Sequence, residues 1–312
     1  MSLFKKNKTK EIDSSASILT KRTRGEKILY AIVSILFGLY ALSLLYPMFF
    51  LIVNSFQDKL TYTNNLAYGA NPFALPKDWH FENYYIALTE MAVISSTGRE
   101  IFLPEMFFNT IWITTCSIIG NILFAAFTGY VMAKYRFGAR EVIYTMVIFS
   151  MTLPVIGTSG SYFKLISDLG LYNTPAYVFV TCIGGWGFNF MIMYGFFKNV
   201  SWSYAEAVFI DGGGHFKAFF KVMLPQAMGP IVTLSIVAFI GGWNDYMTPL
   251  LYMPDYPKIG SGIYLIQTSF TRNGNMPAYF AGLVCSVVPT IIVFICFSDT
   301  IMRNLTVGGL KG

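Results

Sequence analysis

The chain has 312 residues, of which 54% are hydrophobic and 12% charged, and its formal net charge is +6. Soluble domains carry roughly 25% charged residues, so this composition excludes an ordinary soluble globular domain and favours a helical membrane protein. The positive charge does not indicate nucleic-acid binding, because no soluble basic face with stacking aromatic residues accompanies it.

Six apolar stretches are each long enough to cross a bilayer, which takes about 20 residues in a helix. Backbone groups in lipid must pair within their own segment, so helices are expected. We therefore predict an all-α membrane protein with six transmembrane helices, the third interrupted by Pro154, Gly157 and Gly160. The predicted spans are residues 28–54, 106–133, 142–163, 174–197, 229–253 and 278–297.

The basic residues indicate how these spans are oriented. Most of the 22 Lys and Arg residues lie before the first span, after the second and fourth, and after the sixth. Because Lys and Arg are enriched in cytoplasmic loops, both termini are predicted to be cytoplasmic. The connection between spans five and six is predicted to be loop-like. The predicted parts are a basic N-terminal tail at 1–27, the first span at 28–54, a small extracytoplasmic subdomain at 55–105, a five-span core at 106–302 and a C-terminal tail at 303–312.

A polar stretch between spans four and five, residues 201–225, interrupts the apolar pattern, and we call it the hinged segment. It opens with a helix-like SWSYAEAVFI, and the following DGGG predicts a turn because glycine is costly inside a helix. Four apolar residues then follow at the spacing of one helical face: Phe216, Phe219, Phe220 and Met223. A cytoplasmic helix–turn–helix is predicted, suited either to docking in a partner's groove or to lying on lipid.

The hinged segment resembles the EAA motif of bacterial ABC importer permeases. The matching residues are Glu206, Ala207, Asp211, Gly212, Leu224 and Pro225. Other stretches are also similar to this family, namely FNTIWITT, GGWNDYMTPLLY, LPKDWHFENYY and the C-terminal NLTVGGLKG. The resemblance is greatest to the maltose-type, carbohydrate-uptake permeases. Two departures stand out: Val208 where alanine is commoner, and Gly213 followed by Gly214.

This resemblance implies a multi-pass subunit of the bacterial plasma membrane, embedded in membrane lipid, that pairs with a second homologous permease. Two ATP-binding subunits would bind the cytoplasmic face, and an extracytoplasmic solute-binding protein would deliver a sugar or oligosaccharide. The hinged segment would be the coupling helix, with Glu206 as a polar anchor and Ala207 and Gly212 allowing close approach. Phe216, Phe219 and Phe220 would hold it against the helices above, and the tail at Gly308 and Gly309 would reach toward the ATPase.

Candidates for the solute path come from spans four and five, because sugars are held by aromatic stacking and polar side chains. An ionisable residue inside a span is a functional candidate by default, which singles out Asp245. The same residues also suit helix packing or an interfacial aromatic belt, and both alternatives stay open. The six candidates are Trp186, Asn189, Tyr194, Trp243, Asn244 and Asp245.

The chain shows no nucleotide-binding motif, no catalytic pair and no metal-ligand spacing in its sequence. It is therefore expected not to be an enzyme and to bind no cofactor itself, with ATP and Mg²⁺ held by the partner ATPase subunits. Two other classes stay open from the residues alone, an ion-coupled secondary transporter and a membrane scaffold without transport function.

Overall fold

The computed structural model describes residues 23–67, 75–153, 157–272 and 275–307. The chain divides into two compact units, one ending at Val53 and the other beginning at Asn54, and each is described by itself. Most of the predicted N-terminal tail lies outside the described residues, as do Gly308 and Gly309.

Helix α2 (Arg24–Ser55) makes up nearly all of the described part of the first unit. A capping box fixes its start: the Thr23 N–H donates to Glu26 Oε2 (2.8 Å) and the Glu26 N–H donates to Thr23 Oγ1 (3.2 Å). Beyond this cap the helix covers the predicted span 28–54, and its apolar side chains are almost all exposed within the unit. A helix that is apolar on every side suits lipid rather than water.

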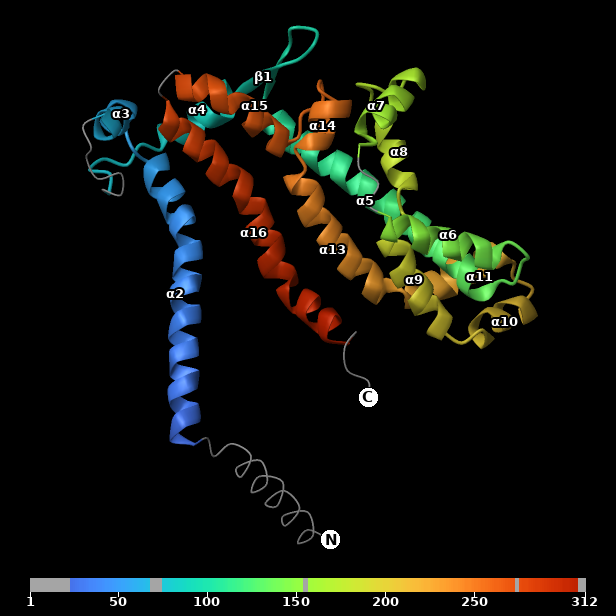
Figure 1. Cartoon of the computed structure of the whole chain (residues 1–312). Helices are drawn as coiled ribbons and strands as arrows, with labels where there is room; N and C mark the ends of the chain where they lie inside the picture. The colour runs from blue at the N-terminus through green and yellow to red at the C-terminus, as the bar shows by residue number, and fades with distance from the viewer. Residues whose placement is uncertain (1–22, 68–74, 154–156, 273–274, 308–312) are drawn as a thin grey trace. The chain divides into compact units, whose positions relative to one another are not determined.

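The described part of the second unit is helical apart from one short hairpin (Figure 1). Its elements in chain order are α3 (Lys59–Ala67), α4 (Glu82–Glu90), β1 (Ala92–Ile94), β2 (Glu100–Phe102), α5 (Leu103–Lys134), α6 (Arg140–Thr152), α7 (Ser159–Asp168), α8 (Tyr177–Ile183), α9 (Phe188–Asn199), α10 (Ser203–Ile210), α11 (His215–Ala218), the π-helix η1 (Phe219–Met223), α12 (Leu224–Gln226), α13 (Met228–Asn244), α14 (Met247–Tyr252), α15 (Ile259–Arg272) and α16 (Met276–Val307).

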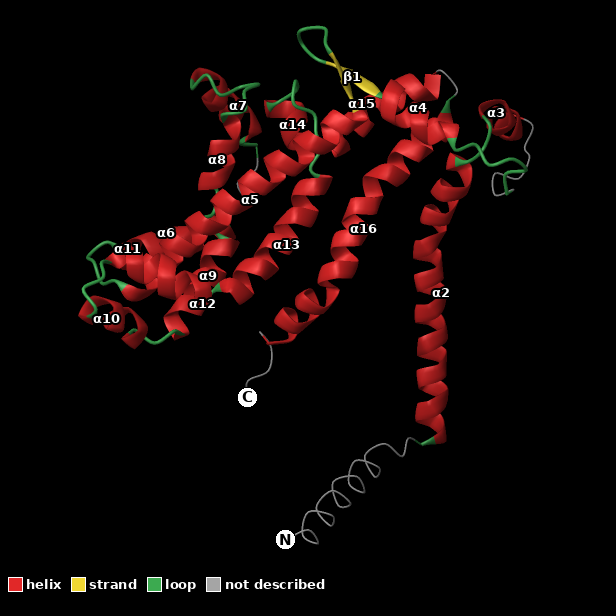
Figure 2. Ribbon diagram, turned by 180° about the vertical axis from the view of Figure 1, so that it is seen from behind, coloured by secondary structure: helices red, strands yellow, loops and turns green. Residues whose placement is uncertain are grey.

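The second unit has two distinct ends, which Figures 1 and 2 show from opposite sides. The hairpin, α4, α14 and α15 lie at one end, and α6, α10, α11 and α12 lie at the other. Helices α5 and α13 run between them, and α16 extends from the hairpin end alongside α13. We call these the hairpin end and the hinge end.

Three described helices are long and apolar enough to cross a membrane by length and composition: Arg24–Ser55, Leu103–Lys134 and Met276–Ser298. Two bent pairs raise the number to as many as five if each pair is one span. These pairs are α8 with α9, bent by 44°, and His215–Gln226 with α13, bent by 72°. The mostly helical membrane architecture is confirmed, whereas the described residues do not reach six spans by this measure.

The third, fourth and fifth predicted spans are not single straight helices. The third is divided between α6 and α7, with Pro154 outside the described residues. The fourth bends between α8 and α9, where Gly187 has φ of +106°, a conformation open mainly to glycine. The fifth ends as α13 at Asn244, and its remaining residues form α14.

The connection between predicted spans five and six contains a helix, α15, so the prediction of a loop-like connection was wrong. Ile259, Ile263 and Ile266 are buried along one face of it, at helical spacing. The glycines of this stretch favour a loop when the sequence is considered alone, but Gly262 lies at a contact between two helices. A Cβ at Gly262 would lie 2.1 Å from Sδ of Met106 on α5, so the glycine lets the two helices approach.

The predicted small subdomain at 55–105 contains α3, α4 and an antiparallel hairpin in which Ala92 pairs with Phe102. The buried Asn83 side chain of α4 donates to the carbonyls of Ser55 (2.8 Å) and Gln57 (2.9 Å). These bonds hold α4 against Ser55 and Gln57, and the hairpin is an element that the sequence did not predict.

One carboxylate joins three separate connections at the hairpin end. Asp255, between α14 and α15, accepts hydrogen bonds from the Ser96 N–H (2.6 Å) at the hairpin tip and from Asn173 Nδ2 (2.7 Å) between α7 and α8. Partial burial raises the pKa of Asp255, but the hydrogen bonds from Ser96 and Asn173 and the charge of Arg99 outweigh it. The net pKa therefore lies below its ordinary value of 3.8.

We expect Asp255→Asn to destabilise the purified subunit by about 1 kcal/mol. In a large domain this loss of unfolding free energy lowers the melting temperature by about 2–4 °C. A carboxyl with a lowered folded-state pKa stabilises the fold above its ordinary pKa and loses this contribution as pH falls through the lowered value. The difference between wild type and variant should thus be constant near neutrality and shrink below about pH 4. Thermal unfolding in detergent across this range measures it, and a pH-independent difference would contradict the assignment.

Candidate functional site

The hinged segment forms two helices joined by a tight turn. Helix α10 ends in a Schellman motif: the Gly213 N–H donates to the Val208 carbonyl (2.8 Å) and the Gly212 N–H donates to that of Phe209 (3.0 Å). Gly212 has φ of +74°, the left-handed conformation that this motif needs and that glycine adopts without strain. The predicted turn is therefore present, with its geometry fixed by backbone hydrogen bonds.

The two departures from the EAA motif meet at this turn. A Cβ on Gly213 would lie 2.5 Å from Cγ1 of Val208 and 2.8 Å from its carbonyl oxygen. The larger residue at 208 thus fits because residue 213 is glycine. His215 begins α11 after the turn, and its Nδ1 is 2.7 Å from the Tyr135 hydroxyl beyond the end of α5.

The second half of the hinged segment packs on a different face from the one predicted. Phe219 and Met223 are buried, but Phe216 and Phe220 are 70% and 53% exposed. The buried face instead contains Ala218, which is fully buried, together with Phe219 and Met223. The chain forms the π-helix η1 from Phe219 to Met223. Of the three phenylalanines expected to hold the segment, Phe219 is buried, and Phe216, although largely exposed, stacks on Phe127 of α5 with ring centroids 6.4 Å apart. Phe220 packs on Phe219.

An aromatic cluster anchors the hinged segment to the transmembrane helices. The Phe219 ring lies 5.2 Å from that of Tyr130 on α5, and Tyr130 lies 5.5 Å from Phe197 on α9. Ala205 of α10 is fully buried in the same cluster. The hinged segment is therefore in direct contact with α5, and through Tyr130 its cluster extends to α9.

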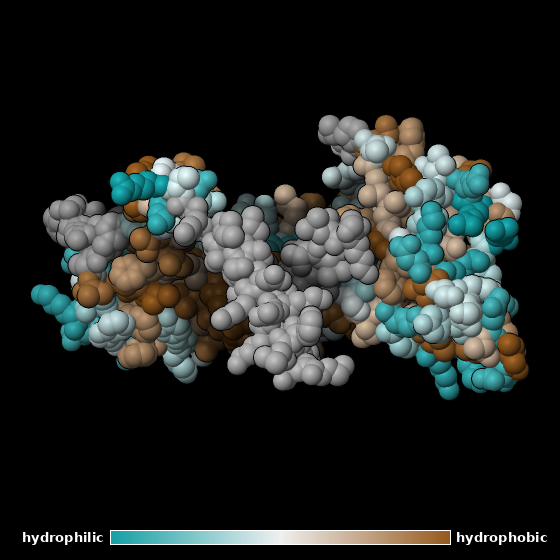
Figure 3. Space-filling view, turned by 90° about the horizontal axis from the view of Figure 1, so that it is seen from below, coloured by the Kyte–Doolittle hydropathy of each residue, from teal (hydrophilic) through white to brown (hydrophobic). Residues whose placement is uncertain are grey.

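The residues predicted to couple to an ATPase lie on the outside of the hinged segment. Leu224 is half-buried, and the other six are exposed: Glu206, Ala207, Asp211, Gly212, Phe216 and Pro225. Figure 3 views the molecule from below Figure 1, and hydrophobic and hydrophilic residues are interspersed on the side where α10 and α11 lie. The structure thus leaves these residues accessible to a partner.

A second feature is a cavity of about 280 Å³ within the helices. Its walls come from α5, α8, α9, α13 and α14, together with Lys258 just before α15. Helix α13 links it to the hinged segment, since α12 leads directly into α13, which lines the cavity with Ala238 and Gly242.

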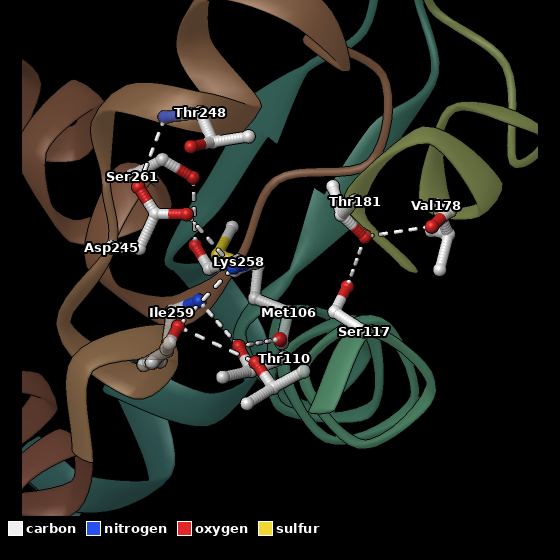
Figure 4. A network of polar contacts seen from close by, with 12 residues as sticks. Met106, Thr110, Ser117, Val178, Thr181, Asp245, Thr248, Lys258, Ile259 and Ser261 are labelled. Carbon is white, nitrogen blue, oxygen red and sulfur yellow. Dashed lines mark hydrogen bonds and ion pairs between the residues drawn. The ribbon is translucent and has the colours of Figure 1, made fainter. Parts of the chain in front are cut away.

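Uncharged polar groups cover one side of this cavity. The hydroxyls of Ser117 on α5 and Thr181 on α8 are 2.7 Å apart, as Figure 4 shows. Asn189 Nδ2 on α9 donates to Asn121 Oδ1 on α5 (2.9 Å). Each of these side chains can both donate and accept hydrogen bonds.

An ion pair lies on the other side. Lys258 Nζ is 3.1 Å from Asp245 Oδ2 and donates to the Gly242 carbonyl (3.2 Å). The other Asp245 oxygen accepts the Thr248 N–H (3.0 Å) at the start of α14. The Lys258 side chain is only 5% exposed, and Figure 4 shows it beside the Thr110–Ile259 contact, 2.8 Å long, that joins α15 to α5.

Two of the six predicted solute-path residues, Asn189 and Asp245, line this cavity, and four do not. Trp243 is buried and donates from Nε1 to the Ser286 carbonyl on α16 (3.0 Å), a packing role. Asn244 is exposed and bonds to its own helix. Trp186 packs on Phe124 and Phe190, and Tyr194 packs on Phe190 and Tyr144.

Sequence reasoning missed most of the cavity's polar wall. Ser117, Asn121 and Thr181 are small polar residues within apolar stretches, and that was the available signal. Lys258 lies outside the predicted spans, in the connection between spans five and six, and no sequence spacing connects it with Asp245.

The fold and this site define a membrane component of a transport system, and comparison with known proteins agrees. The chain belongs to the family described as binding-protein-dependent transport system inner membrane component, which matches residues 121–305. This membership decides against an ion-coupled secondary transporter or a scaffold without transport function.

Similar proteins and a similar structure add detail. The chain is 28% identical over 284 residues to the diacetylchitobiose uptake system permease protein NgcG of Streptomyces coelicolor, covering 90% of this chain and 89% of the relative. It is 27% identical over 290 residues to the arabinooligosaccharides transport system permease protein AraQ of Halalkalibacterium halodurans, covering 91% and 98%. A chain of a bacterial ABC transporter involved in the import of the acidic polysaccharide alginate has the same fold, with TM-score 0.72, 23% identity and coverage of 89% and 98%.

We expect Gly213→Ala to destabilise the subunit by roughly 1–3 kcal/mol, because the new methyl group overlaps Val208. Val208→Ala removes the closest overlapping atom, so Gly213→Ala should cost less in that background. A double-mutant cycle of unfolding free energies, from thermal or denaturant unfolding in detergent, measures this coupling. Additive costs would contradict the proposed fit of the two residues.

Proposed function

We propose that this chain is one transmembrane subunit of an ATP-driven ABC importer and forms part of the path for a sugar or oligosaccharide. A single observation carries the proposal: an accessible helix–turn–helix continues through α12 and α13 into the wall of a cavity that contains polar groups. The permease relatives, named for diacetylchitobiose and arabinooligosaccharides, support a carbohydrate as the solute.

The hinged segment is the proposed docking site for an ATPase subunit. Its exposed residues Glu206, Ala207 and Gly212 would face the partner, while Ala205 and Phe219 fix it to the aromatic cluster. ATP and Mg²⁺ would be held by two such partner subunits, and this chain would contribute no hydrolytic group. A second homologous permease and an extracytoplasmic solute-binding protein would complete the transporter.

The proposed topology has six spans with both termini in the cytoplasm. Supporting it, basic residues at the ends of α5 and α9 and on α11 gather at the hinge end of the second unit. Lys134 there donates to the Val200 carbonyl, and Lys198 lies in the last turn of α9. In this topology the third span comprises α6 and the start of α7, and the hairpin end is extracytoplasmic.

We expect Glu206→Lys to reduce ATP-driven uptake by at least about tenfold, because reversing a charge at a docked surface costs several kcal/mol. The probes are labelled diacetylchitobiose and arabino-oligosaccharides, supplied to cells or proteoliposomes containing the full transporter. Membrane insertion and the amount of protein should be unchanged, since the Glu206 side chain is exposed.

The matched control is Glu141→Lys, which reverses another exposed acid at the hinge end, on α6 and outside the hinged segment. It should keep nearly full uptake. Equal uptake by the wild type and the Glu206 variant would refute the coupling role.

A further inference from the structure

The charges around the cavity cancel. Among the described residues that line it, only Asp245 and Lys258 carry charges, and they form an ion pair with Nζ and Oδ2 3.1 Å apart. Each is also bonded to the backbone, Lys258 to Gly242 and Asp245 to Thr248. The Lys258 side chain is buried and that of Asp245 is 27% exposed, and a buried lysine charge left without its partner would be costly.

The rest of the polar lining is made of hydroxyl and amide groups. These are Thr114, Ser117, Asn121, Tyr177, Thr181, Asn189 and Thr248. Such groups donate and accept with equal ease, which matches the hydroxyls of a sugar ring. The cavity, at about 280 Å³, is near the lower end of the roughly 300–1,000 Å³ typical of small-molecule pockets, so it suits a short unit rather than a long chain.

A carboxylate entering this cavity would meet no free cation, because Lys258 is already paired. It would have to leave water without a compensating charge, and burying an unpaired ion is strongly unfavourable. An uncharged sugar pays no such penalty. The chain shares its fold with a chain of an importer named for an acidic polysaccharide, so the fold itself does not set the charge preference.

We propose that the cavity admits uncharged, hydroxyl-bearing sugar units and rejects carboxylate-bearing ones, and that Asp245 sets this selectivity by neutralising Lys258. The inference rests on the proposed importer function and specifies its solute class. It assigns Asp245 a role that differs from a direct solute contact.

The test uses the full transporter, with the four native cysteines of this chain replaced and one reporter, Thr248→Cys, facing the cavity. A small uncharged thiol reagent modifies the reporter, and added solutes are scored by how far they slow this reaction. The two solutes are methyl glucoside and glucuronate, which have the same ring type with and without a carboxylate.

With Asp245 present, methyl glucoside should slow modification and glucuronate should not. In Asp245→Asn, the glucuronate concentration for half protection should fall by at least about tenfold, or about 1.4 kcal/mol. The double variant Asp245→Asn with Lys258→Met is neutral again and should return to rejecting glucuronate. This control separates the charge from any loosening of the structure.

If Asp245→Asn does not assemble, Lys258→Met tests the inference with the opposite charge. This variant leaves the Asp245 carboxylate unpaired, so the cavity should favour protonated glucosamine. Protection by both solutes with Asp245 present, protection by neither, or no change in the single variants would overturn the inference. Uptake is not used, so a failed uptake experiment with intact protection would count against the importer function alone.

Discussion

The close approach of α5 to α8, α9 and α13 is the constraint on which the rest of the second unit depends. Apolar side chains gain little free energy by moving from lipid into a contact between helices. Membrane helices therefore associate through small residues, which let their backbones approach closely. A Cβ at Gly129 would lie 2.8 Å from the Tyr194 nitrogen, one at Gly120 2.2 Å from Sγ of Cys182, and one at Gly242 2.7 Å from Thr114. These contacts fix the cavity walls.

Because α5 runs between the two ends, it connects both parts of the site. Toward the hinge end it carries Tyr130, which packs on Phe219 of the hinged segment. Farther along it carries Ser117 and Asn121, which line the cavity. Close-packed interiors transmit strain with little compression, so α5 is a direct physical link between the hinged segment and the cavity.

Much of the fold could be predicted because hydropathy is a local property. The long apolar runs correspond to α2, α5 and α16, and the glycines at 212–214 mark a real turn. The features that the sequence did not predict share one cause, which is packing between segments that are distant in the chain. Helix α15 contains glycines but forms because Gly262 fits against Met106, and Trp243 serves packing because Ser286 of α16 accepts its N–H.

The sequence by itself determined the class of protein: its apolar runs require membrane helices, and the hinged segment resembles a permease motif. Only the tertiary structure decided which side chains form the cavity, because those residues come from five helices and two connections. It also decided that Lys258 neutralises Asp245, since they are 13 positions apart and meet only when the chain leaves α14 and turns back into α15. Local periodicity contains no information about such a contact, whereas close packing imposes it.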